Sequence, residues 1–228
     1  MTVTAVSWRL NLEIMFKNRW EAGERLAEKI FQSFPEGLFK DVIILAVPRG
    51  GVVVGRVIAE KIDCSLDIIV TRKIGSPGTK ELAIGAVGET SGSAYLNKKI
   101  IGELDISEEY LQKEILEQKK EIKRREKLYR EDRHSLKLEG KIVVLVDDGA
   151  ATGATLIAAC REVWNNNPKK VIIALPVAPR DTVRKLGKEA DEVIVLQSPE
   201  PFFSVGQFYE EFEQIEDKEV IRNLQCHS

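Results

Sequence analysis

The chain has 228 residues, of which 43% are hydrophobic and 31% are charged, and its formal net charge is −2. A chain of this length and composition is expected to bury a core of its own, in one large or two small soluble domains. The near balance of acids and bases excludes a strong overall field, so neither nucleic acid nor an anionic membrane is an expected partner.

The first segment, MTVTAVSWRLNLEIMFKNRW, has no leader-like apolar stretch, and no later stretch reaches the ~18 apolar residues of a membrane helix. Cys64, Cys160 and Cys226 are far apart and form no CxxC pair, which favours a reducing compartment. These features indicate a cytoplasmic protein.

The apolar pattern along the chain predicts alternating strands and helices. An amphipathic helix is expected at 16–31, ahead of the first strand. Short runs rich in valine and isoleucine predict buried strands at 42–47, 66–71, 141–146, 169–177 and 191–197. Helical patterns lie between them at 51–62, 152–164 and 181–190. This order predicts an α/β fold, in which an open parallel sheet is flanked by helices.

A long, highly charged helix is predicted at 107–133, where the alternation is interrupted. Its apolar stripe is thin and consists of Leu111, Ile115, Ile122 and Tyr129. Glutamates stand four residues ahead of basic residues at several positions, which favours a solvated helix that covers one side of the molecule. The alternative is that one of its arginines reaches an anionic ligand; the candidates are Arg124, Arg125 and Arg130.

The segment VVLVDDGAATGATL (143–156) runs from a buried strand into two adjacent aspartates and a loop of small residues. In an open α/β sheet, ligands bind where the parallel strands end. The backbone N–H groups of the loop can form an anion nest at a helix start, and the hydroxyl groups of Thr152 and Thr155 can add donors. The carboxylates of Asp147 and Asp148 can accept hydrogen bonds from ribose hydroxyls. The segment therefore predicts a site for a ribose 5-phosphate.

Other interpretations of the glycine-rich segments are weaker. Gly153 is followed by Ala154 rather than by the lysine of a P-loop, and Gly50, Gly51 and Gly55 do not form G-x-G-x-x-G. The chain has no G-x-S-x-G, and its two histidines have no partners at metal-ligand spacing. The remaining alternative is an ordinary strand-to-helix turn with an aspartate pair near the helix start.

The stretch VVLVDDGAATGAT resembles the phosphoribosyl diphosphate (PRPP) motif of type I phosphoribosyltransferases. Further segments resemble one group of bacterial and archaeal members whose natural acceptor is not established: AVPRGG (46–51), TRKIGSPGTKELAIGAVGE (71–89), RREKLYR (124–130) and PFFSVGQFYEEF (201–212). The resemblance implies a phosphoribosyltransferase core at 36–200, with a helical insertion at about 100–138. A smaller hood would come from 1–35, from the insertion and from a cap at 201–228.

The resemblance also implies roles for particular residues. Asp147 and Asp148 would hold the ribose hydroxyls. The 5′-phosphate would be held by Gly149, Ala150, Ala151, Thr152, Gly153, Ala154 and Thr155. The diphosphate would be held by Arg49, Gly50, Gly51, Arg72, Lys73 and Lys80, with a cis peptide expected at Pro48–Arg49. Arg72 and Lys73 are expected to end a strand, and the loop SPGTKEL after them to close over the diphosphate. Mg²⁺ would be bound mainly through PRPP oxygens and water, with no protein ligands.

The implied reaction is displacement of diphosphate at the anomeric carbon. Its catalytic residues would be Asp147, Asp148, Arg49, Lys73 and Glu81, the last from the loop that closes. Phe203 would stack on the acceptor and Ser204 would contact its edge; the alternative is that the aromatic residues of 202–212 merely pack a C-terminal cap. Ala151 stands where 6-oxopurine enzymes have an aspartate that acts on the base. The resemblance as a whole implies a ring-nitrogen acceptor, with a purine-like base as one candidate.

Two other functions are compatible with this fold. A PRPP-sensing regulator would bind the ligand and a nucleic acid without transfer, but it should have a basic face without balancing acids. An interaction subunit with a dead site is disfavoured by the intact aspartate pair and the PRGG segment. The expected partners are PRPP and a small-molecule acceptor, with no membrane and no nucleic acid; a homodimer is compatible with the sequence.

Overall fold

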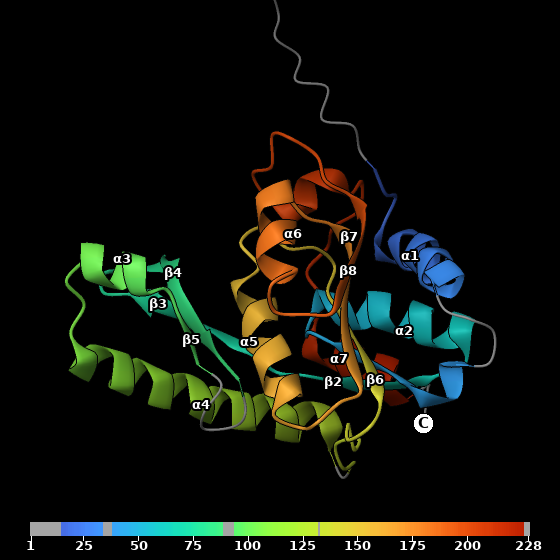
Figure 1. Cartoon of the computed structure of the whole chain (residues 1–228), viewed down its shortest axis with the longest axis horizontal. Coiled ribbons are helices and arrows are strands. Elements are labelled where there is room, and N and C mark those ends of the chain that lie inside the picture. The colour runs from blue at the N-terminus through green and yellow to red at the C-terminus, as the bar shows by residue number, and fades with distance from the viewer. Residues whose placement is uncertain (1–14, 34–37, 89–93, 132, 226–228) are drawn as a thin grey trace, which may run out of the picture.

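The computed structural model describes residues 15–33, 38–88, 94–131 and 133–225, apart from the side chains of Leu38, Lys80 and Glu81. A five-stranded, all-parallel sheet in the order β2-β1-β6-β7-β8 lies at the centre (Figure 1). The strands are β1 (Val42–Ala46), β2 (Ser65–Ile68), β6 (Ile142–Val146), β7 (Lys170–Val177) and β8 (Glu192–Gln197). The predicted open parallel α/β sheet is confirmed.

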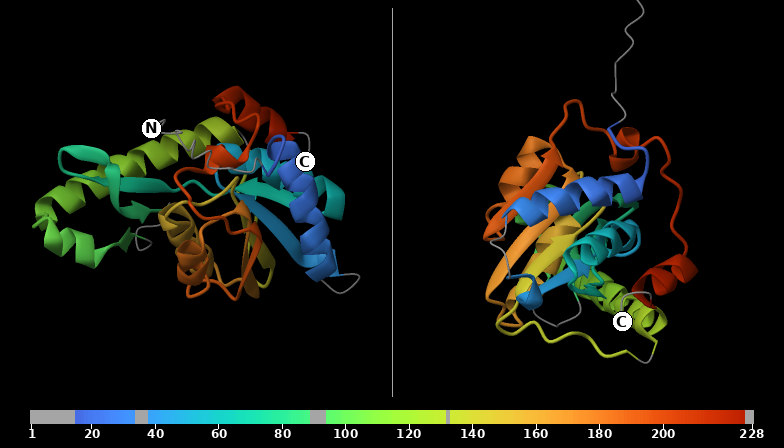
Figure 2. Two further views of the ribbon diagram at one scale, coloured as in Figure 1. Left: turned by 90° about the horizontal axis from the view of Figure 1, so that it is seen from above. Right: turned by 90° about the vertical axis from the view of Figure 1, so that its right-hand side faces the viewer.

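Helices cover both faces of this sheet, which is why its inner strands are aliphatic along their whole length. Ile44 and Val144 face helices α1 (Arg19–Ser33) and α2 (Gly50–Ile62), whereas Leu45 and Leu145 face α5 (Ala154–Trp164). The helix α6 (Arg180–Leu186) adds Leu186 to the α5 side. Figure 2 shows α1 and α2 together on one side of the sheet. The strand alternation thus divides the core into two layers.

Strands β1 and β6 are hydrogen-bonded neighbours, with Ala46 paired to Val146 at their carboxyl ends. The segment after β1 therefore lies beside the segment after β6. This arrangement is what a single ligand held by PRGG and DDGAATG requires.

A second sheet projects from the core, and it was not predicted. It is antiparallel, in the order β3 (Arg72–Ser76), β4 (Thr79–Val87) and β5 (Tyr95–Leu96), and it is followed by α3 (Lys98–Glu103) (Figure 1). Strand β2 ends at Ile68, so the expectation that Arg72 and Lys73 end a strand is wrong: they begin β3. Gly75 and Gly85 lie in this hairpin and the pairing shifts register around Gly75, so the strands show no clean alternation along the sequence.

The segment SPGT, expected within a loop, is the turn of this hairpin. Ser76 pairs with Thr79, the Ser76 hydroxyl donates to the Thr79 carbonyl oxygen at 3.0 Å, and Gly78 has φ of 77°. Glycine adopts that conformation at little cost. The segment therefore belongs to an ordered strand pair, and any closure over a ligand would move the hairpin as a unit.

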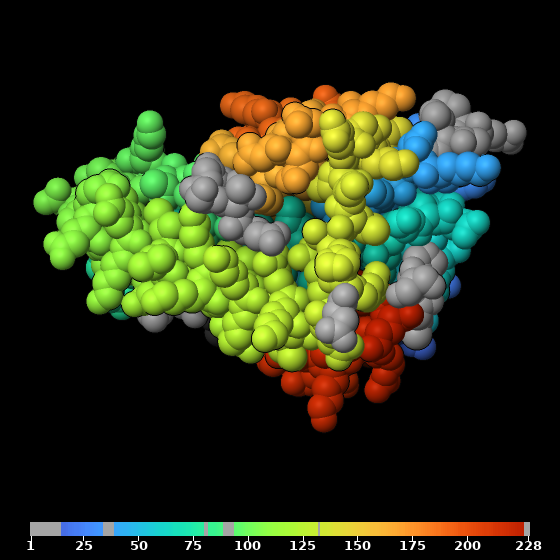
Figure 3. Space-filling view, turned by 90° about the horizontal axis from the view of Figure 1, so that it is seen from below, coloured from blue at the N-terminus to red at the C-terminus, as the bar shows by residue number. Residues whose placement is uncertain are grey.

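The long charged helix is α4 (Glu108–Arg130), and Ser107 caps its first turn by accepting from the Tyr110 N–H. The predicted stripe is only partly right: Leu111, Ile122 and Tyr129 are buried, but so are Glu114 and Glu126. The helix packs on β3 along one part and on α7 (Asp217–Gln225) along another. Figure 3 shows its yellow-green surface running from the projecting lobe to the red surface of α7. It joins two parts of the molecule rather than only covering one side.

The C-terminal segment passes the start of α1 before it reaches α7. The short helix η2 (Val205–Phe208) is hydrogen-bonded to the residues just before α1. The Phe208 carbonyl oxygen accepts from the N–H of Phe16 at 3.0 Å. The other short helix is η1 (Leu38–Asp41), just before β1.

None of the helices in the described ranges is long and apolar enough to cross a membrane.

Candidate active site

Asp147 and Asp148 lie directly after β6, at the carboxyl edge of the sheet. The Asp147 carboxylate accepts from the Asp148 N–H at 2.9 Å, which orients the first side chain against the backbone of the second. Burial and the neighbouring charge of Asp148 raise the pKa of Asp147 well above its ordinary value. Burial also raises the pKa of Asp148, but Arg19 acts in the opposite direction. The pair is thus arranged so that a ligand with hydroxyl donors or positive charge would stabilise both carboxylates.

Arg19 was not identified from the sequence, although it contacts the aspartate pair directly. Its Nε donates to Asp148 Oδ2 at 2.7 Å, its Nη1 donates to the Glu213 carbonyl oxygen at 2.8 Å, and its guanidinium lies 3.8 Å from the ring centroid of Phe212. Only 8% of the residue is exposed. The arginine joins α1, the aspartate pair and the C-terminal segment. No local signal marks it, because it looks like any other basic residue near a helix start.

The PRGG segment packs against the aspartates through its glycines. A Cβ on Gly50 would lie 1.9 Å from Asp148 Oδ2, and one on Gly51 would lie 2.8 Å from the Val146 carbonyl oxygen. Neither position can hold a side chain without displacing these groups. The peptide bond between Pro48 and Arg49 is cis, as the resemblance implied.

The Arg49 guanidinium lies near the start of α7. Its Nη1 is 3.7 Å from Asp217 Oδ1, at the start of α7, and the Tyr129 hydroxyl donates to the same oxygen at 2.6 Å. Both charged side chains are about one-third exposed, so this ion pair is weak and a diphosphate could replace the carboxylate as the partner of Arg49.

The loop 149–155 is hydrogen-bonded to β7 and α6, and some of its N–H groups are left without a backbone acceptor in the part of the chain that the structure describes. The Ala150 N–H donates to the Val177 carbonyl oxygen at 3.0 Å, and the Thr182 hydroxyl donates to the Ala151 carbonyl oxygen at 2.6 Å. Within the described ranges, the N–H groups of Ala151, Thr152 and Gly153 have no backbone acceptor. Gly153 has φ of 76° and directly precedes α5, so these donors lie at a helix start. Donors without backbone acceptors at a helix start are what an anion nest requires, so this loop is a candidate phosphate site.

The other residues predicted to bind the ligand lie in the rest of this loop and on strands β3 and β4. Gly149 has φ of 154°, and a Cβ there would meet Val205 and Val177; Ala154 begins α5. Thr155 accepts from the Thr71 hydroxyl through its backbone oxygen at 3.3 Å. Arg72 and Lys73 line a cavity together with Pro48 and Thr155, which places them beside both loops. Lys80 and Glu81 are on β4, but their side chains lie outside the described part of the chain.

The segment 201–212, predicted to contact the acceptor, contains both buried aromatic side chains and the exposed ring of Phe203. Phe208 and Tyr209 are 2% and 5% exposed, whereas Phe203 is 71% exposed. The Tyr209 hydroxyl donates to the Asp148 carbonyl oxygen at 2.6 Å, and Val205 lies against Gly149, so the segment adjoins the aspartate loop. The cap interpretation therefore holds for Phe208 and Tyr209 but not for Phe203.

Gln207 organises the exposed end of this segment and was also missed. Its Oε1 accepts from the N–H groups of Phe203 and Ser204 at 2.9 and 3.1 Å, and its Nε2 donates to the Pro201 carbonyl oxygen at 3.0 Å. The Ser204 side chain is exposed. A spacing of three residues between a serine and a glutamine is the signal that could have indicated this capping arrangement.

The sequence predicts that Mg²⁺ is bound through PRPP rather than by a cluster of protein ligands. Within the described part of the chain, no group of three or more His, Cys, Asp or Glu residues lies close enough together to hold a metal ion. An ion that keeps its water and binds substrate oxygens, as Mg²⁺ does with phosphates, needs no such group. The expectation of Mg²⁺ bound through PRPP remains a prediction.

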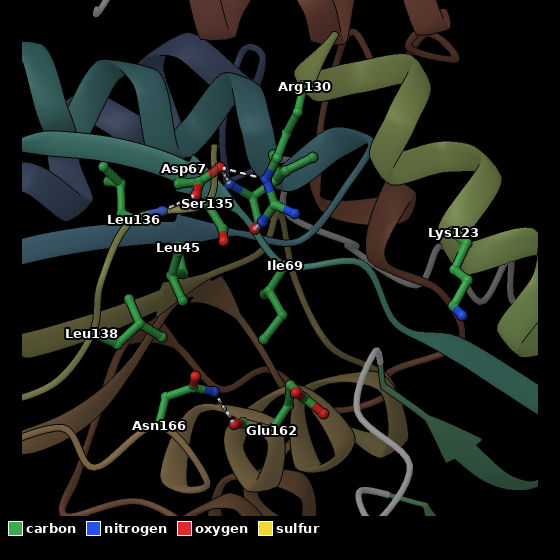
Figure 4. A pocket seen from close by; sticks show the side chains of 11 residues that line it. Leu45, Asp67, Ile69, Lys123, Arg130, Ser135, Leu136, Leu138, Glu162 and Asn166 are labelled. Atoms are coloured by element: carbon green, nitrogen blue, oxygen red, sulfur yellow. Dashed lines mark hydrogen bonds and ion pairs between the residues drawn. The ribbon is translucent and has the colours of Figure 1, made fainter. Parts of the chain in front are cut away.

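A cavity of about 450 Å³ lies apart from these residues, between α4, the 135–138 segment and α5. Figure 4 shows the Asp67 carboxylate facing Arg130 and Leu136; it accepts from Arg130 Nε at 3.2 Å and from the Leu136 N–H at 3.0 Å. Arg130 Nη2 also donates to the Ile68 carbonyl oxygen at 2.8 Å. The alternative that Arg130 reaches an anionic ligand is therefore not supported, because its guanidinium fastens α4 to β2.

The strand order, the aspartate pair after β6 and the nest before α5 together define a type I phosphoribosyltransferase fold. The comparison with known families agrees, since the model of the phosphoribosyl transferase domain matches residues 16–211. The chain belongs to this family.

Individual relatives are consistent with this assignment. Two proteins of Mycobacterium tuberculosis, from strains CDC 1551 and H37Rv and provisionally named as phosphoribosyl transferases, are each 39% identical over 210 residues. The matched region is 92% of this chain and 46% of theirs, so the chain spans about half the length of these curated relatives. The crystal structure of TT1426 from Thermus thermophilus is 36% identical, with a TM-score of 0.77, and the match covers 93% of this chain and 99% of that one.

Proposed function

We propose that the chain transfers the phosphoribosyl group of PRPP to a ring nitrogen of a small acceptor, releasing diphosphate. One observation carries the proposal: the Gly50 backbone is in contact with the Asp148 carboxylate, which leaves no room for a Cβ. The loop expected to hold a diphosphate and the acids expected to hold a ribose thus adjoin one another. A ligand that has both groups on one sugar would be bound by both.

Each part of PRPP has a candidate partner. The carboxylates of Asp147 and Asp148 would accept from the ribose hydroxyls, in charge-assisted hydrogen bonds. The N–H groups of Ala151, Thr152 and Gly153 would donate to the 5′-phosphate at the start of α5. Arg49 and the N–H groups of Gly50 and Gly51 would face the diphosphate, with Arg72, Lys73 and Lys80 nearby.

In the reaction, the bond between the anomeric carbon and the diphosphate oxygen breaks and a bond from the acceptor nitrogen to that carbon forms. Positive charge develops on the sugar ring, and the aspartate pair stabilises it more strongly in the transition state than in the ground state. Arg49 and Lys73 stabilise the departing diphosphate. Mg²⁺, bound mainly through PRPP oxygens and water, would supply further neutralisation of that anion. The acceptor's proton passes to a base, for which Glu81 is a candidate.

Phe203 supports a planar acceptor. An aromatic ring that is 71% exposed would gain free energy by stacking on a flat heterocycle. Ala151 has only a methyl group at the position where an acidic side chain would contact the base, so it gives no preference for a 6-oxopurine. A purine-like base without that requirement is the best candidate.

The test is to incubate the protein with PRPP, Mg²⁺ and a panel of bases, and to measure diphosphate release together with PRPP binding by calorimetry. Asp147→Asn and Asp148→Asn should each weaken PRPP binding by about tenfold and reduce turnover further, because only the transition state carries the developing charge. Tight PRPP binding with no diphosphate release across the panel would favour a PRPP-sensing regulator. Failure to bind PRPP would overturn the proposal.

A further inference from the structure

A cavity of about 290 Å³ extends from the candidate diphosphate loop toward the inserted helix α4. Its lining includes Pro48 and Thr155 beside the two loops, Arg72 and Lys73 on β3, and Glu114, Gln118 and Arg125 on α4. Two separate elements of the projecting lobe thus place three cationic side chains in a single cavity beside the PRGG loop.

Arg72 is held in a fixed orientation without a carboxylate partner. Its Nε donates to Gln118 Oε1 at 3.0 Å, and Gln118 Nε2 donates to Glu114 Oε1 at 2.7 Å, so a neutral amide separates the arginine from the nearest acid on that side. Among the side chains that the structure describes, no carboxylate forms an ion pair with Arg72. Burial lowers the pKa of Arg72 and the positive charge of Arg125 lowers it further, whereas the negative charge of Glu121 acts in the opposite direction. An anion in the cavity that both arginines line would favour the charged form of Arg72 and offset the repulsion between the two guanidinium groups.

Arg125 differs from the two other arginines that were candidates for an anionic ligand. Arg130 is bound to Asp67 and Ile68, and Arg124 is 56% exposed with its Nε and Nη2 on Glu121. Arg125 bonds Glu121 through Nε at 2.8 Å, is 23% exposed, and lines the cavity. That bond uses one edge of the guanidinium, which leaves the other edge for a ligand.

Tyr129 indicates that Arg125 lies close to the diphosphate loop. Burial and the hydrogen bond to Asp217 raise the pKa of Tyr129 to about 12, and the positive charges of Arg125 and Arg49 both act in the opposite direction. Arg49 is in the PRGG segment, so the two arginines act on one hydroxyl group from different elements. The geometry agrees, because Pro48 of that loop and Arg125 line the same cavity.

We propose that Arg125, together with Arg72 oriented by Gln118, binds the diphosphate end of the ligand, so that the inserted helix supplies part of the substrate site. The proposal rests on the proposed function. It assigns α4 a direct role in binding: a guanidinium from the insertion would contact the oxygens of the leaving group, beyond those that the PRGG loop reaches.

The experiment measures binding of two probes by calorimetry: inorganic diphosphate with Mg²⁺, and ribose 5-phosphate. Arg125→Gln should weaken diphosphate binding about tenfold to a hundredfold, the value of a charged hydrogen bond. Ribose 5-phosphate binding should be unchanged, since that probe occupies the aspartates and the nest. Gln118→Glu should also weaken diphosphate binding, because it places a carboxylate on Arg72 with little change of shape.

Arg124→Gln is the matched control, since it removes the same charge from the same helix and the same Glu121 partner. It should change diphosphate binding less than about twofold, because its side chain points to solvent rather than into the cavity. Equal losses in Arg124→Gln and Arg125→Gln would overturn the proposal, because they would show only a long-range charge effect. Unchanged diphosphate binding in Arg125→Gln would overturn it as well. If the parent protein binds neither probe, the proposed function itself has failed; if it binds ribose 5-phosphate but not diphosphate, only this inference has failed.

Discussion

Arg19 and Asp148 are 129 residues apart in the sequence, yet Arg19 Nε donates to Asp148 Oδ2 at 2.7 Å. Their side chains are only 9% and 14% exposed. The Arg19 charge opposes the effect of burial on the pKa of Asp148, which leaves Asp147 as the acid with the more strongly raised pKa. The first described helix therefore contributes to the candidate site as well as covering the core.

Replacement of Arg19 by glutamine should destabilise the fold by about 3 kcal/mol, because it leaves the Asp148 charge buried without its partner. The double variant Arg19→Gln/Asp148→Asn should recover much of this loss, since it removes the unpaired charge. Urea unfolding of the single and double variants measures both effects. Arg184→Gln, at an ion pair whose side chains are 77% exposed, is the control and should change stability by less than about 0.5 kcal/mol. Additive effects in the double variant would contradict the coupling.

The same Arg19 variant should change the pH dependence of PRPP binding. Without the guanidinium, the pKa of Asp148 rises, so the ionised form needed to accept from a ribose hydroxyl is lost at a higher pH than in the parent. Calorimetric titration of PRPP across a pH series should therefore show the acidic fall in affinity displaced upward. Arg19→Lys, which keeps the charge, should show a smaller displacement. An unmoved acidic limb in Arg19→Gln would indicate a structural role only.

Replacement of Asp147 by asparagine should stabilise the protein at neutral pH while it weakens PRPP binding. The folded chain binds the Asp147 proton more tightly than the unfolded chain does. The free energy of unfolding therefore falls as pH rises from the ordinary pKa of an aspartate through the raised pKa of Asp147. The variant has no such proton to lose, so its advantage in Tm should grow through that window and disappear below it. Each 1 kcal/mol would appear as about 2–4 °C in a chain of this size. A lower Tm than the parent above neutral pH would contradict the assignment.

Replacement of Gly50 by alanine should abolish PRPP binding and separate Arg19 from Asp148. The new Cβ would lie 1.9 Å from Asp148 Oδ2 and 2.9 Å from Arg19 Nε, so the ion pair must move. Gly102→Ala is the control, because nothing lies within 4 Å of a Cβ there and its φ is not positive. The control should bind PRPP like the parent and gain stability slightly, as expected for alanine in a helix. Wild-type affinity in Gly50→Ala would show that the two loops do not share a ligand.

Replacement of Phe203 by alanine should raise the KM for the acceptor about fivefold without weakening PRPP binding, since a stacked aromatic pair contributes about 1 kcal/mol. The free energy of unfolding should hardly change, because the ring is 71% exposed. Leu116→Ala, at a leucine that is 57% exposed on α4, controls for loss of surface apolar area. Steady-state kinetics with the best acceptor from the panel measures the effect. Equal KM values in the two variants would remove Phe203 from the acceptor site.

The amino-acid sequence by itself determined the strands and helices of the parallel sheet and the contiguous aspartate loop, because neighbouring residues are enough to indicate them. Valine and isoleucine runs such as 42–47 and 141–146 are typical of buried strands, and their alternation with helices favours a parallel sheet. Asp147, Asp148 and the loop up to Thr155 are contiguous, so their chemistry could be inferred from adjacent residues. The strands at 42–47 and 141–146 must be neighbours if the PRGG segment and the aspartates share a ligand, and β1 and β6 are indeed paired.

Only the tertiary structure decided which distant side chains complete the site. Arg19 reaches Asp148, Asp217 reaches Arg49, and Arg125 lines a cavity with Arg72, each from a different part of the chain. An arginine on a charged helix has no periodicity that distinguishes a ligand-binding role from a solvated one. The hairpin at 72–87 was missed for a related reason, because Gly75 and Gly85 carry no side chain to mark its faces. Local pattern determines which elements form, whereas the packing of elements against one another determines which of their polar groups meet.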